Sequence, residues 1–421
     1  MQVDNKNPKL AWTMWLTTLS FLFYQFIARS SFPTVLTERL MSHFQLDAAG
    51  IGVLVSCYYW VYTLMQIPAG ILVDKFSLRK ITTIGILMCS FGVLLFIATP
   101  NCYIAACGQI MLGFGSSFAF MSALKVVSNY FPAKEIPMKS SLTMAVGCSG
   151  PVVGGPAVAF LVEHFEWISL MRCFALFGLL LAAIAMVVMQ DEKVEDVQLS
   201  QSSVISSLKT IIFSRQVWVL ALYTMAQYAP LSAMGDLWGR SFIQKVCDVD
   251  AKIASVISNM IYIGVVVGSP VFAYLAKTMN SYKKPMIIGI IGAAASMAVI
   301  LACGKLPLTA AFFLFFSLGF SCASALAYPL VLVMFPPSLG ASASGFVNMA
   351  SMVSGIILMP LVGYIVKCFW NGVTENGVSV YSLNDFRLGL LSVLAFLTVG
   401  ILLSLLVQDR SPQQKRTEES K

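Results

Sequence analysis

Long apolar runs separated by short polar gaps fill almost the whole chain. Each run holds about 18 or more largely apolar residues, which is the length that an α-helix needs to cross a lipid bilayer. Counting them gives about twelve expected spans, near residues 12–36, 50–73, 81–99, 103–128, 138–162, 169–189, 216–243, 253–277, 285–303, 308–334, 343–367 and 387–407. This pattern predicts an all-α membrane protein with the lipid bilayer as its surroundings.

The composition agrees with this prediction. Of the 421 residues, 58% are hydrophobic and 11% are charged, with a mean hydropathy of +0.82, whereas roughly 25% of residues are charged in a soluble domain. The formal net charge of +8 is spread over the short gaps and forms no basic stripe with interleaved aromatic residues. Nucleic-acid binding is therefore not indicated.

Lysine and arginine residues gather in alternate gaps between the apolar runs, which sets the expected orientation. These basic residues are Lys9, Lys75, Arg79, Lys80, Lys134, Lys139, Lys193, Lys209, Arg215, Lys277, Lys283, Lys284, Arg410, Lys415 and Arg416. The positive-inside rule then places both termini in the cytoplasm. The first apolar run is too long for a signal-peptide core, so we expect it to remain in the mature protein.

The longest polar interruption lies halfway along the chain. It begins at Asp191 and continues through a stretch rich in serine and glutamine to Ser207. We expect it to divide the chain into an N-terminal half of six helices (1–189), a cytoplasmic linker (190–215), a C-terminal half of six helices (216–408) and a cytoplasmic tail (409–421).

Several kinds of chemistry have no support in the sequence. The ten cysteines are scattered without a Cys-x-x-Cys pair, and two histidines, His43 and His164, are too few for a zinc site. Phosphate-binding loops of the Walker type, GxSxG and HExxH are missing. We therefore expect no enzyme activity, no catalytic residue, no metal and no cofactor. A passive or ion-coupled carrier remains.

The most specific motif lies between the second and third runs and reads Gly70-Ile71-Leu72-Val73-Asp74-Lys75-Phe76-Ser77-Leu78-Arg79-Lys80. It resembles the signature loop of the major facilitator superfamily, which has Gly, three residues, Asp, a basic residue, one residue, Gly, one residue and two basic residues. Ser77 stands where that family usually has glycine. The resemblance implies a twelve-helix fold of two pseudo-symmetric six-helix halves.

The residues of this loop suggest a gate. Gly70 permits close helix contact, and Asp74 can cap a neighbouring helix and pair with Lys75, Arg79 and Lys80 as a latch on the cytoplasmic side. The corresponding turn of the second half has Lys277 at the carboxylate position, followed by Lys283 and Lys284. Two charged turns about 200 residues apart fit a parallel repeat.

Two further spans carry informative residues. The fifth contains Gly150-Pro151-Val152-Val153-Gly154-Gly155-Pro156, which is similar to a superfamily motif associated with proton-linked antiporters. We interpret Gly150, Pro151, Gly154 and Gly155 as a packing seam and hinge. In the fourth span, Gln109 stands where many superfamily carriers have arginine. Lys125 in the same span either faces the cavity or snorkels to the cytoplasm.

At a finer level the chain resembles the branch of the superfamily that includes phagosomal amino-acid transporters of intracellular bacterial pathogens. The segments that carry this resemblance are Gly113–Phe120, Asn129–Pro132, Asp236–Gly239, Gly268–Pro270 and Gly345–Met349. The resemblance implies uptake of amino acids or related nutrients together with protons.

Arg29 is the first candidate for a functional residue. A guanidinium inside a span costs ~2.5 to 3.5 kcal/mol on insertion scales, so protein, water or a bound anion must solvate it. The seventh span is the repeat mate of the first and holds Asp236 at a similar depth. This pair suits a zwitterion, with Arg29 binding a carboxylate and Asp236 binding an ammonium. The alternatives are a gate salt bridge between Arg29 and Asp236, or local pairing of Asp236 with Arg240.

Helical spacing adds further candidates for the lining of a polar cavity. They lie one turn from Arg29 or share one face of a span, although small polar stripes more often mediate helix packing. The candidates are Gln25, Tyr59, Tyr62, Gln66, Asn259, Tyr262, Tyr328 and Asn348.

The sequence thus predicts an alternating-access carrier, most simply a monomer, in a bacterial inner membrane. It would take up a small charged or zwitterionic organic solute, an amino acid or related nutrient, in symport with protons bound at Asp236. One alternative is an exporter of organic anions, siderophores or drugs. Another is a membrane sensor that has lost turnover, against which the intact Asp74 loop argues.

Overall fold

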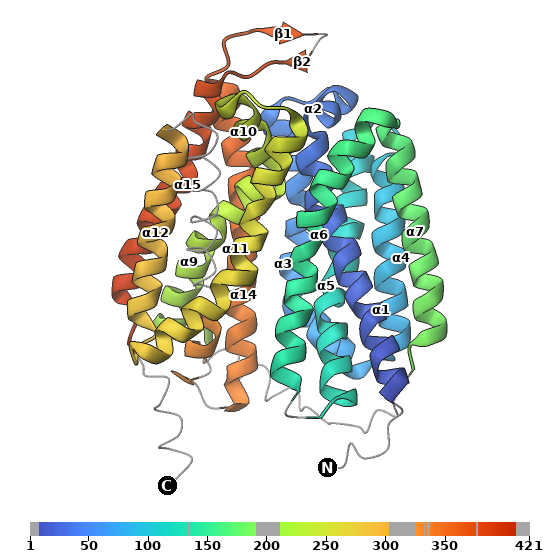
Figure 1. Cartoon of the computed structure of the whole chain (residues 1–421), viewed down its shortest axis with the longest axis vertical. Coiled ribbons are helices and arrows are strands. Elements are labelled where there is room, and N and C mark those ends of the chain that lie inside the picture. The colour runs from blue at the N-terminus through green and yellow to red at the C-terminus, as the bar shows by residue number, and fades with distance from the viewer. Residues whose placement is uncertain are drawn as a thin grey trace. The chain divides into compact units, whose positions relative to one another are not determined.

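The computed structural model describes residues 8–132, 135–190, 211–302, 326–331, 333–334, 337–375 and 378–409. Long helices occupy nearly all of this part of the chain (Figure 1). Most of the expected linker (190–215), the first two thirds of the tenth expected span (308–334) and most of the tail (409–421) lie outside the described residues.

The first span is one continuous helix with a wider turn in its middle. It consists of α1 (Pro8–Phe26), the π-helix η1 (Ile27–Ser31) and α2 (Phe32–Phe44). Pro33 lies just beyond η1. Because proline has no N–H to donate to the carbonyl of residue i−4, which is Arg29, and its ring collides with that carbonyl, regular α-helical bonding cannot continue there. The π turn is the local solution.

The remaining helices of the first half follow with short connections. They are α3 (Ala48–Lys75), α4 (Leu78–Phe96), α5 (Cys102–Tyr130), α6 (Ile136–His164) and α7 (Trp167–Val188). Side-chain caps fix several starting points: Ser77 accepts from the amide of Lys80, and Asn101 accepts from the amides of Tyr103 and Ile104. Such caps satisfy amides that have no partner within the helix.

The second half begins with another interrupted helix, made of α9 (Arg215–Pro230), the π-helix η2 (Leu231–Trp238) and α10 (Gly239–Cys247). It continues with α11 (Ala251–Thr278), α12 (Lys283–Ala302), helical residues 326–331, α14 (Pro337–Cys368) and α15 (Leu383–Leu406). Two short antiparallel strands, β1 (Thr374–Glu375) and β2 (Val378–Ser379), form a hairpin between α14 and α15 (Figure 1).

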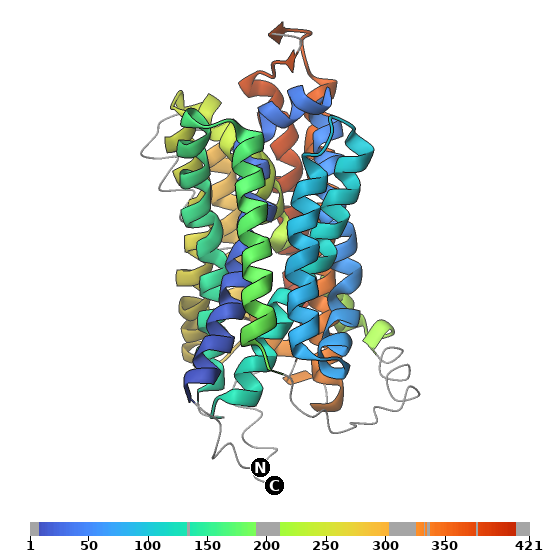
Figure 2. The same ribbon diagram turned by 90° about the vertical axis from the view of Figure 1, so that its right-hand side faces the viewer.

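The helices divide into two compact units. Unit 1 comprises residues 1–46 and 53–197, and unit 2 comprises residues 47–52 and 198–421. In unit 1, α4 packs against α5 and α7, and α1 packs against α5, α6 and α7 (Figure 2). In unit 2, α9 packs against α14 and α15, and α12 packs against α15.

Small residues allow the helices of unit 1 to approach closely. A Cβ added at Gly92 would lie 2.7 Å from the carbonyl oxygen of Gly108, and one added at Gly85 would lie 3.1 Å from that of Gly115. Glycines at helix crossings are typical of membrane proteins, where van der Waals contact rather than a difference in hydrophobicity holds helices together. The α4–α5 crossing thus depends on the absence of side chains at these positions.

Ten helices in the described part of the chain are long and apolar enough to cross a membrane. The helix Arg215–Cys247 falls outside this set, and its apolar run is interrupted by Gln227, Ser232 and Asp236. Large apolar side chains such as Leu64 and Val187 are exposed on the outside of the helices. An all-α membrane fold requires such surfaces to face lipid.

The six residues Asp47–Gly52 group with unit 2 although α3 continues into unit 1. Lys367 Nζ lies 2.7 Å from Asp47 Oδ2, and the amide of Ala48 donates to the Tyr381 hydroxyl at 2.9 Å. Burial alone would raise the pKa of Asp47, but hydrogen bonds from the Lys367 ammonium and the Gly50 amide outweigh it and hold that pKa below its usual value.

Candidate functional site

Arg29 lies in η1, in the middle of the helix Pro8–Phe44, and only 4% of its surface is exposed. The sequence places it near the end of the first apolar run, but the helix continues to Phe44, so the arginine lies deeper than expected. π turns inside long helices occur frequently at functional sites, because they turn side chains out of the regular register. The location supports Arg29 as a functional candidate.

Aromatic rings surround the guanidinium. Its central carbon lies 4.6 Å from the ring centroid of Phe26, 5.7 Å from that of Tyr59 and 5.8 Å from that of Tyr58. Ring faces attract a cation without neutralising it, and each contact is worth about 0.5–2 kcal/mol. This arrangement stabilises the charge inside unit 1.

Tyr58 connects the predicted residues around Arg29. Its hydroxyl donates to Gln25 Oε1 at 3.3 Å, and its ring stacks on that of Tyr62. The sequence argument identified Gln25, Tyr59 and Tyr62 but missed Tyr58 and Phe26. The spacing of four residues between Tyr58 and Tyr62 was the available signal, since residues i and i+4 share a helix face.

The glycine seam of α6 packs directly against this part of the first span. A Cβ at Gly150 would lie 3.0 Å from the carbonyl oxygen of Phe23, and one at Gly154 would lie 2.8 Å from Ile27 Cγ1 and Ser31 Oγ. Both glycines therefore give η1 the space that it occupies. A hinge role for Pro151 and Gly155 remains a prediction.

Asp236 lies in η2 and is fully buried in unit 2. Pro230 directly precedes this π-helix, and its missing N–H explains the change of bonding at that point. The hydroxyl of Tyr262, also fully buried, donates a short hydrogen bond to Asp236 Oδ1. The hydroxyl satisfies one hydrogen-bond acceptor of a carboxylate that is otherwise removed from water.

Two other predicted residues meet in the same unit. The Tyr328 hydroxyl donates to Asn348 Oδ1 at 2.9 Å. Asn259 instead bonds within its own helix, where its Nδ2 donates to the carbonyl of Ser255 at 2.8 Å. Gln66, in unit 1, also bonds locally, through a 3.1 Å hydrogen bond from Nε2 to the carbonyl of Tyr62.

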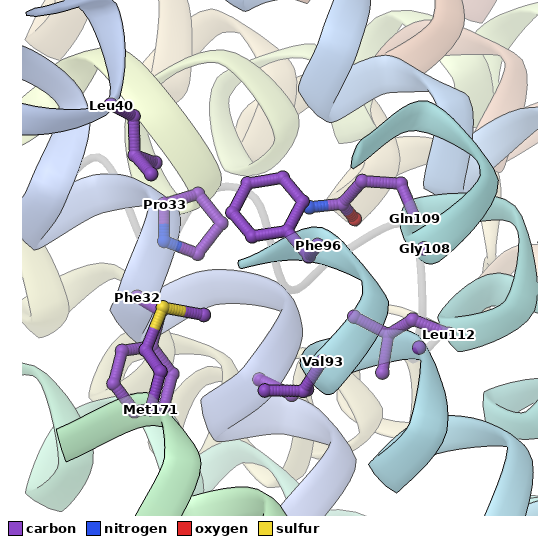
Figure 3. A pocket seen from close by; sticks show the side chains of 11 residues that line it. Phe32, Pro33, Leu40, Val93, Phe96, Gly108, Gln109, Leu112 and Met171 are labelled. Carbon is purple, nitrogen blue, oxygen red and sulfur yellow. The ribbon is translucent and has the colours of Figure 1, made fainter. Parts of the chain in front are cut away.

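A small cavity lies in unit 1 beside η1 (Figure 3). Its volume is about 10 Å³, which is room for about one water molecule. It is lined by Ala28, Phe32, Pro33, Leu40, Gly92, Val93, Phe96, Gly108, Gln109, Leu112 and Met171. Gln109, with only 4% of its surface exposed, is the main polar group of this lining. The cavity is too small and too apolar to hold an organic ion.

The residues of the Gly70–Lys80 loop fall into two groups. Asp74 and Lys75 lie in the last turns of α3, and their side chains are outside the described part of the structure. Arg79 Nε donates to the carbonyl of Met189 at 2.7 Å, and Ser77 caps α4. Outside its own helix turn, no described atom lies within 4 Å of a Cβ added at Gly70, and the close helix contact expected there remains a prediction.

Lys125 contacts the same end of α3. Its Nζ donates to the carbonyl of Val73 at 2.6 Å. Carbonyls in the last turn of a helix have no partner within the helix and carry partial negative charge, so a lysine there is stabilising. Lys125 therefore contacts the end of α3 beside the Gly70–Lys80 loop. Lys80 is exposed and lies one turn into α4.

Within the described residues, no group of three or more His, Cys, Asp or Glu side chains is arranged to hold a metal ion. The buried ionisable groups include Arg29, beside aromatic rings, and Asp236, beside the Tyr262 hydroxyl. Such an arrangement can bind an organic ion or a proton, and it provides no nucleophile paired with a base.

Comparison with known proteins identifies the family. The model of the Major Facilitator Superfamily matches residues 17–359 and 240–421. Among solved structures, a bacterial homologue of the human lysosomal transporter Spinster has a TM-score of 0.80 at 13% identity and covers 96% of this chain and 98% of its own. The nucleoside transporter NupG, as a D323A mutant, has a TM-score of 0.77 at 16% identity, with 94% and 99% covered.

Curated relatives match a shorter region. The Uncharacterized transporter YybO of Bacillus subtilis is 32% identical over 134 residues, which are 32% of this chain and 31% of that protein. The Probable galactarate/D-glucarate transporter GarP of Escherichia coli is 27% identical over 146 residues, 33% of each chain. The Potential vesicular glutamate transporter vglu-3 of Caenorhabditis elegans is 28% identical over 150 residues, 34% of this chain and 28% of that protein. Each match spans about a third of the relative's length.

The chain belongs to the Major Facilitator Superfamily. The membrane-length helices in the described part of the chain agree with the multi-pass architecture of this family. The predicted all-α fold and the superfamily resemblance of the Gly70–Lys80 loop are thereby confirmed.

Proposed function

We propose that this transporter takes up a small carboxylate-bearing solute, with an amino acid or related zwitterionic nutrient as the leading candidate. Transport occurs by alternating access across a bacterial inner membrane, with both termini in the cytoplasm and a proton as the coupled ion. The observation that carries this proposal is Arg29, a buried guanidinium on a π turn of unit 1, surrounded by aromatic rings.

The chemistry of Arg29 favours a carboxylate. Arginine presents a planar fork of N–H donors that matches the two oxygens of a carboxylate. Several relatives carry names that point to carboxylate solutes, namely galactarate or D-glucarate for GarP and glutamate for vglu-3. Riboflavin and nucleoside carriers are also similar to the chain, so relatedness alone does not select a substrate.

Asp236 is the proposed proton site. It is a fully buried carboxylate in a π-helix of the seventh span, next to the hydroxyl of Tyr262. Ionisable residues within transmembrane segments commonly serve as proton relays or solute-binding groups. In a zwitterion carrier the same carboxylate would meet the ammonium, so solute and proton would compete for it.

The exporter alternative receives less support. It rests on the similarity of the Gly150–Pro156 segment to a motif of antiporters, but Gly150 and Gly154 have a packing role against the first span. The sensor alternative predicts solute binding without net flux. Arg29→Ala separates a drug exporter from a carboxylate carrier, because a drug carrier would tolerate the loss of the cation.

Uptake into proteoliposomes tests the proposal. Purified full-length protein is reconstituted and given a pH gradient, acidic outside, with a labelled amino-acid mixture, L-glutamate and D-glucarate in separate assays. We expect accumulation of at least one amino acid, abolished by a protonophore and competed by the unlabelled compound. Accumulation of D-glucarate alone would move the substrate to the aldarates. Efflux without uptake would support the exporter, and binding without flux would support the sensor.

A further inference from the structure

The turn between α11 and α12 in unit 2 is the second copy of the charged loop, and its carboxylate position is occupied by Lys277. The structure nevertheless preserves the capping arrangement. Ser281 Oγ accepts from the amide of Lys284 at 3.1 Å, as Ser77 Oγ accepts from the amide of Lys80 at 3.1 Å in unit 1. Each loop therefore begins the next helix with the same serine cap.

A second contact is shared by the two units. The basic residue two positions after the capping serine reaches the end of the last helix of its own unit. Arg79 Nε donates to the carbonyl of Met189 at 2.7 Å, and Lys283 Nζ donates to the carbonyl of Leu405 at 2.6 Å. In both cases a cation satisfies a helix C-terminal carbonyl, where the helix dipole favours positive charge.

Unit 2 has an additional carboxylate at this point. Beyond the end of α15, both oxygens of Asp409 lie 2.8 Å from Ser281 Oγ, and Oδ1 accepts from the amide of Lys283 at 3.3 Å. Ser281 is only 2% exposed. The carboxylate thus lies at the N-terminus of α12, where backbone amides and the helix dipole favour an anion.

The residues around the end of α15 also contact the start of α9. Gln216, at the start of α9, donates through Nε2 to the carbonyl of Leu406 at 3.2 Å and accepts through Oε1 from the amide of Gln408 at 3.1 Å. The residues that follow α15 are therefore fixed against the first turns of α9 and α12. This rigid setting places Asp409 accurately, although its own surface is exposed.

We propose that Asp409 supplies, from 128 positions away, the carboxylate that the second copy of the loop has lost. It is a positioning residue that ties the end of α15 to the start of α12, so that these helices move as one body. The transport cycle of a superfamily member requires its helices to move in groups. The role is independent of the solute, so its test does not depend on the proposed function.

Hydrogen exchange on the purified full-length protein in lipid nanodiscs tests this proposal. Asp409→Asn removes the charge and should speed exchange of the amides of Lys283 and Lys284 by about tenfold or more, the effect of losing one charge-assisted hydrogen bond. Ser281→Ala should give a similar effect. The double variant should exchange little faster than either single one, because both changes remove the same contact.

Two further variants separate positioning from simple loss of a helix cap. Asp250→Asn removes a carboxylate that caps α11 locally, through the amide of Ile253, and should leave exchange at Lys283 unchanged. Asp409→Glu keeps the charge and should restore protection to within about threefold of the wild type. The proposal would be overturned if Asp409→Asn exchanged like the wild type, if Asp409→Glu exchanged as fast as Asp409→Asn, or if the Asp409 and Ser281 effects were additive.

Discussion

The first and seventh spans make the same departure from α-helical geometry and place opposite charges there. In each, a π-helix beside a proline interrupts a long helix: η1 with Pro33 in unit 1 and η2 with Pro230 in unit 2. η1 carries Arg29, whose neighbours are aromatic faces, whereas η2 carries Asp236, whose neighbour is a hydroxyl donor. The two halves thus share a π-helix beside a proline in this span, but the buried charge on it differs in sign.

This difference has a physical consequence for each ion. The faces of aromatic rings attract the guanidinium of Arg29, whereas the Tyr262 hydroxyl donates a hydrogen bond to the carboxylate of Asp236. We therefore expect the two spans to respond differently to substitution. Arg29 should determine which solute binds, and Asp236 should determine the coupling of transport to the proton.

The largest effect should follow from Asp236→Asn, which removes the proposed proton site. Uphill uptake supported by the pH gradient should be abolished, while exchange of solute across the membrane retains some activity. The measurement compares net uptake with counterflow in the same proteoliposomes. Asp385→Asn is a matched control, because Asp385 is also buried but belongs to the capping box at the start of α15. Normal proton-supported accumulation in Asp236→Asn would place the coupling site elsewhere.

Two tyrosines allow the comparison to be sharpened. The Tyr262 hydroxyl donates to a carboxylate, whereas the Tyr58 hydroxyl donates to the neutral amide of Gln25. Tyr262→Phe should therefore lower the free energy of unfolding by about 1.5–3 kcal/mol and Tyr58→Phe by about 0.5–1.5 kcal/mol. Thermal unfolding of both variants in one detergent measures the difference. Equal losses of unfolding free energy in the two variants would contradict the view that Arg29 and Asp236 are stabilised by different kinds of neighbour.

The charged loop of each unit extends the comparison to the proposed gates. Asp74→Asn in unit 1 and Asp409→Asn in unit 2 should each lower the maximal rate of transport several-fold. The solute concentration that gives half of this rate should change little, because both residues lie far from Arg29 and Asp236 in the sequence. We expect Asp74→Asn to have the larger effect, since its loop retains the carboxylate of the motif. The test compound is the one that the wild type accumulates. Uptake rates measured at varied concentrations of this compound separate the maximal rate from the half-saturating concentration. A large loss of affinity with normal turnover would reject the gating role.

The smallest effect concerns the ion pair of Asp47 with Lys367. The pKa of Asp47 is lowered from its ordinary value of 3.8, so the ionised form stabilises the fold. This contribution is complete above the ordinary value and is lost as the pH falls through the lower, folded-state value. The difference in unfolding midpoint between wild type and Asp47→Asn should stay constant from neutral pH to about pH 5 and vanish at lower pH. Lys367→Met should remove the same pH dependence.

Much of the architecture follows from the sequence because spanning a bilayer imposes strong rules. Apolar runs of about 20 residues must become helices, and the eleven expected spans that lie in the described residues are all helical. The π turns were not predicted, since hydrophobic periodicity does not report a single wider turn. The prolines beside them, Pro33 and Pro230, are visible in the sequence. Each proline explains the interruption of the helix only at its own position.

The candidate site could be predicted only in part. Contacts along one helix, such as Tyr58 with Tyr62, follow from spacing, but contacts between helices depend on how the helices rotate against each other. Tyr328 with Asn348 and Tyr262 with Asp236 were each named as candidates without being paired. Asp409 was not recognised because its partner, Ser281, lies 128 residues away and the local motif had lost its carboxylate.

The claim that Arg29 binds the carboxylate of the solute is tested most directly by binding measurements with one solute and its carboxamide analogue. The compound is the one that the wild type accumulates in proteoliposomes, and both forms are titrated against wild type and Arg29→Lys. The account predicts that the wild type prefers the carboxylate and that Arg29→Lys loses about 1–3 kcal/mol of binding free energy for it, because lysine keeps the charge without the planar fork. It predicts little change for the carboxamide. Equal binding of both compounds by the wild type would contradict the account and leave Arg29 a structural charge.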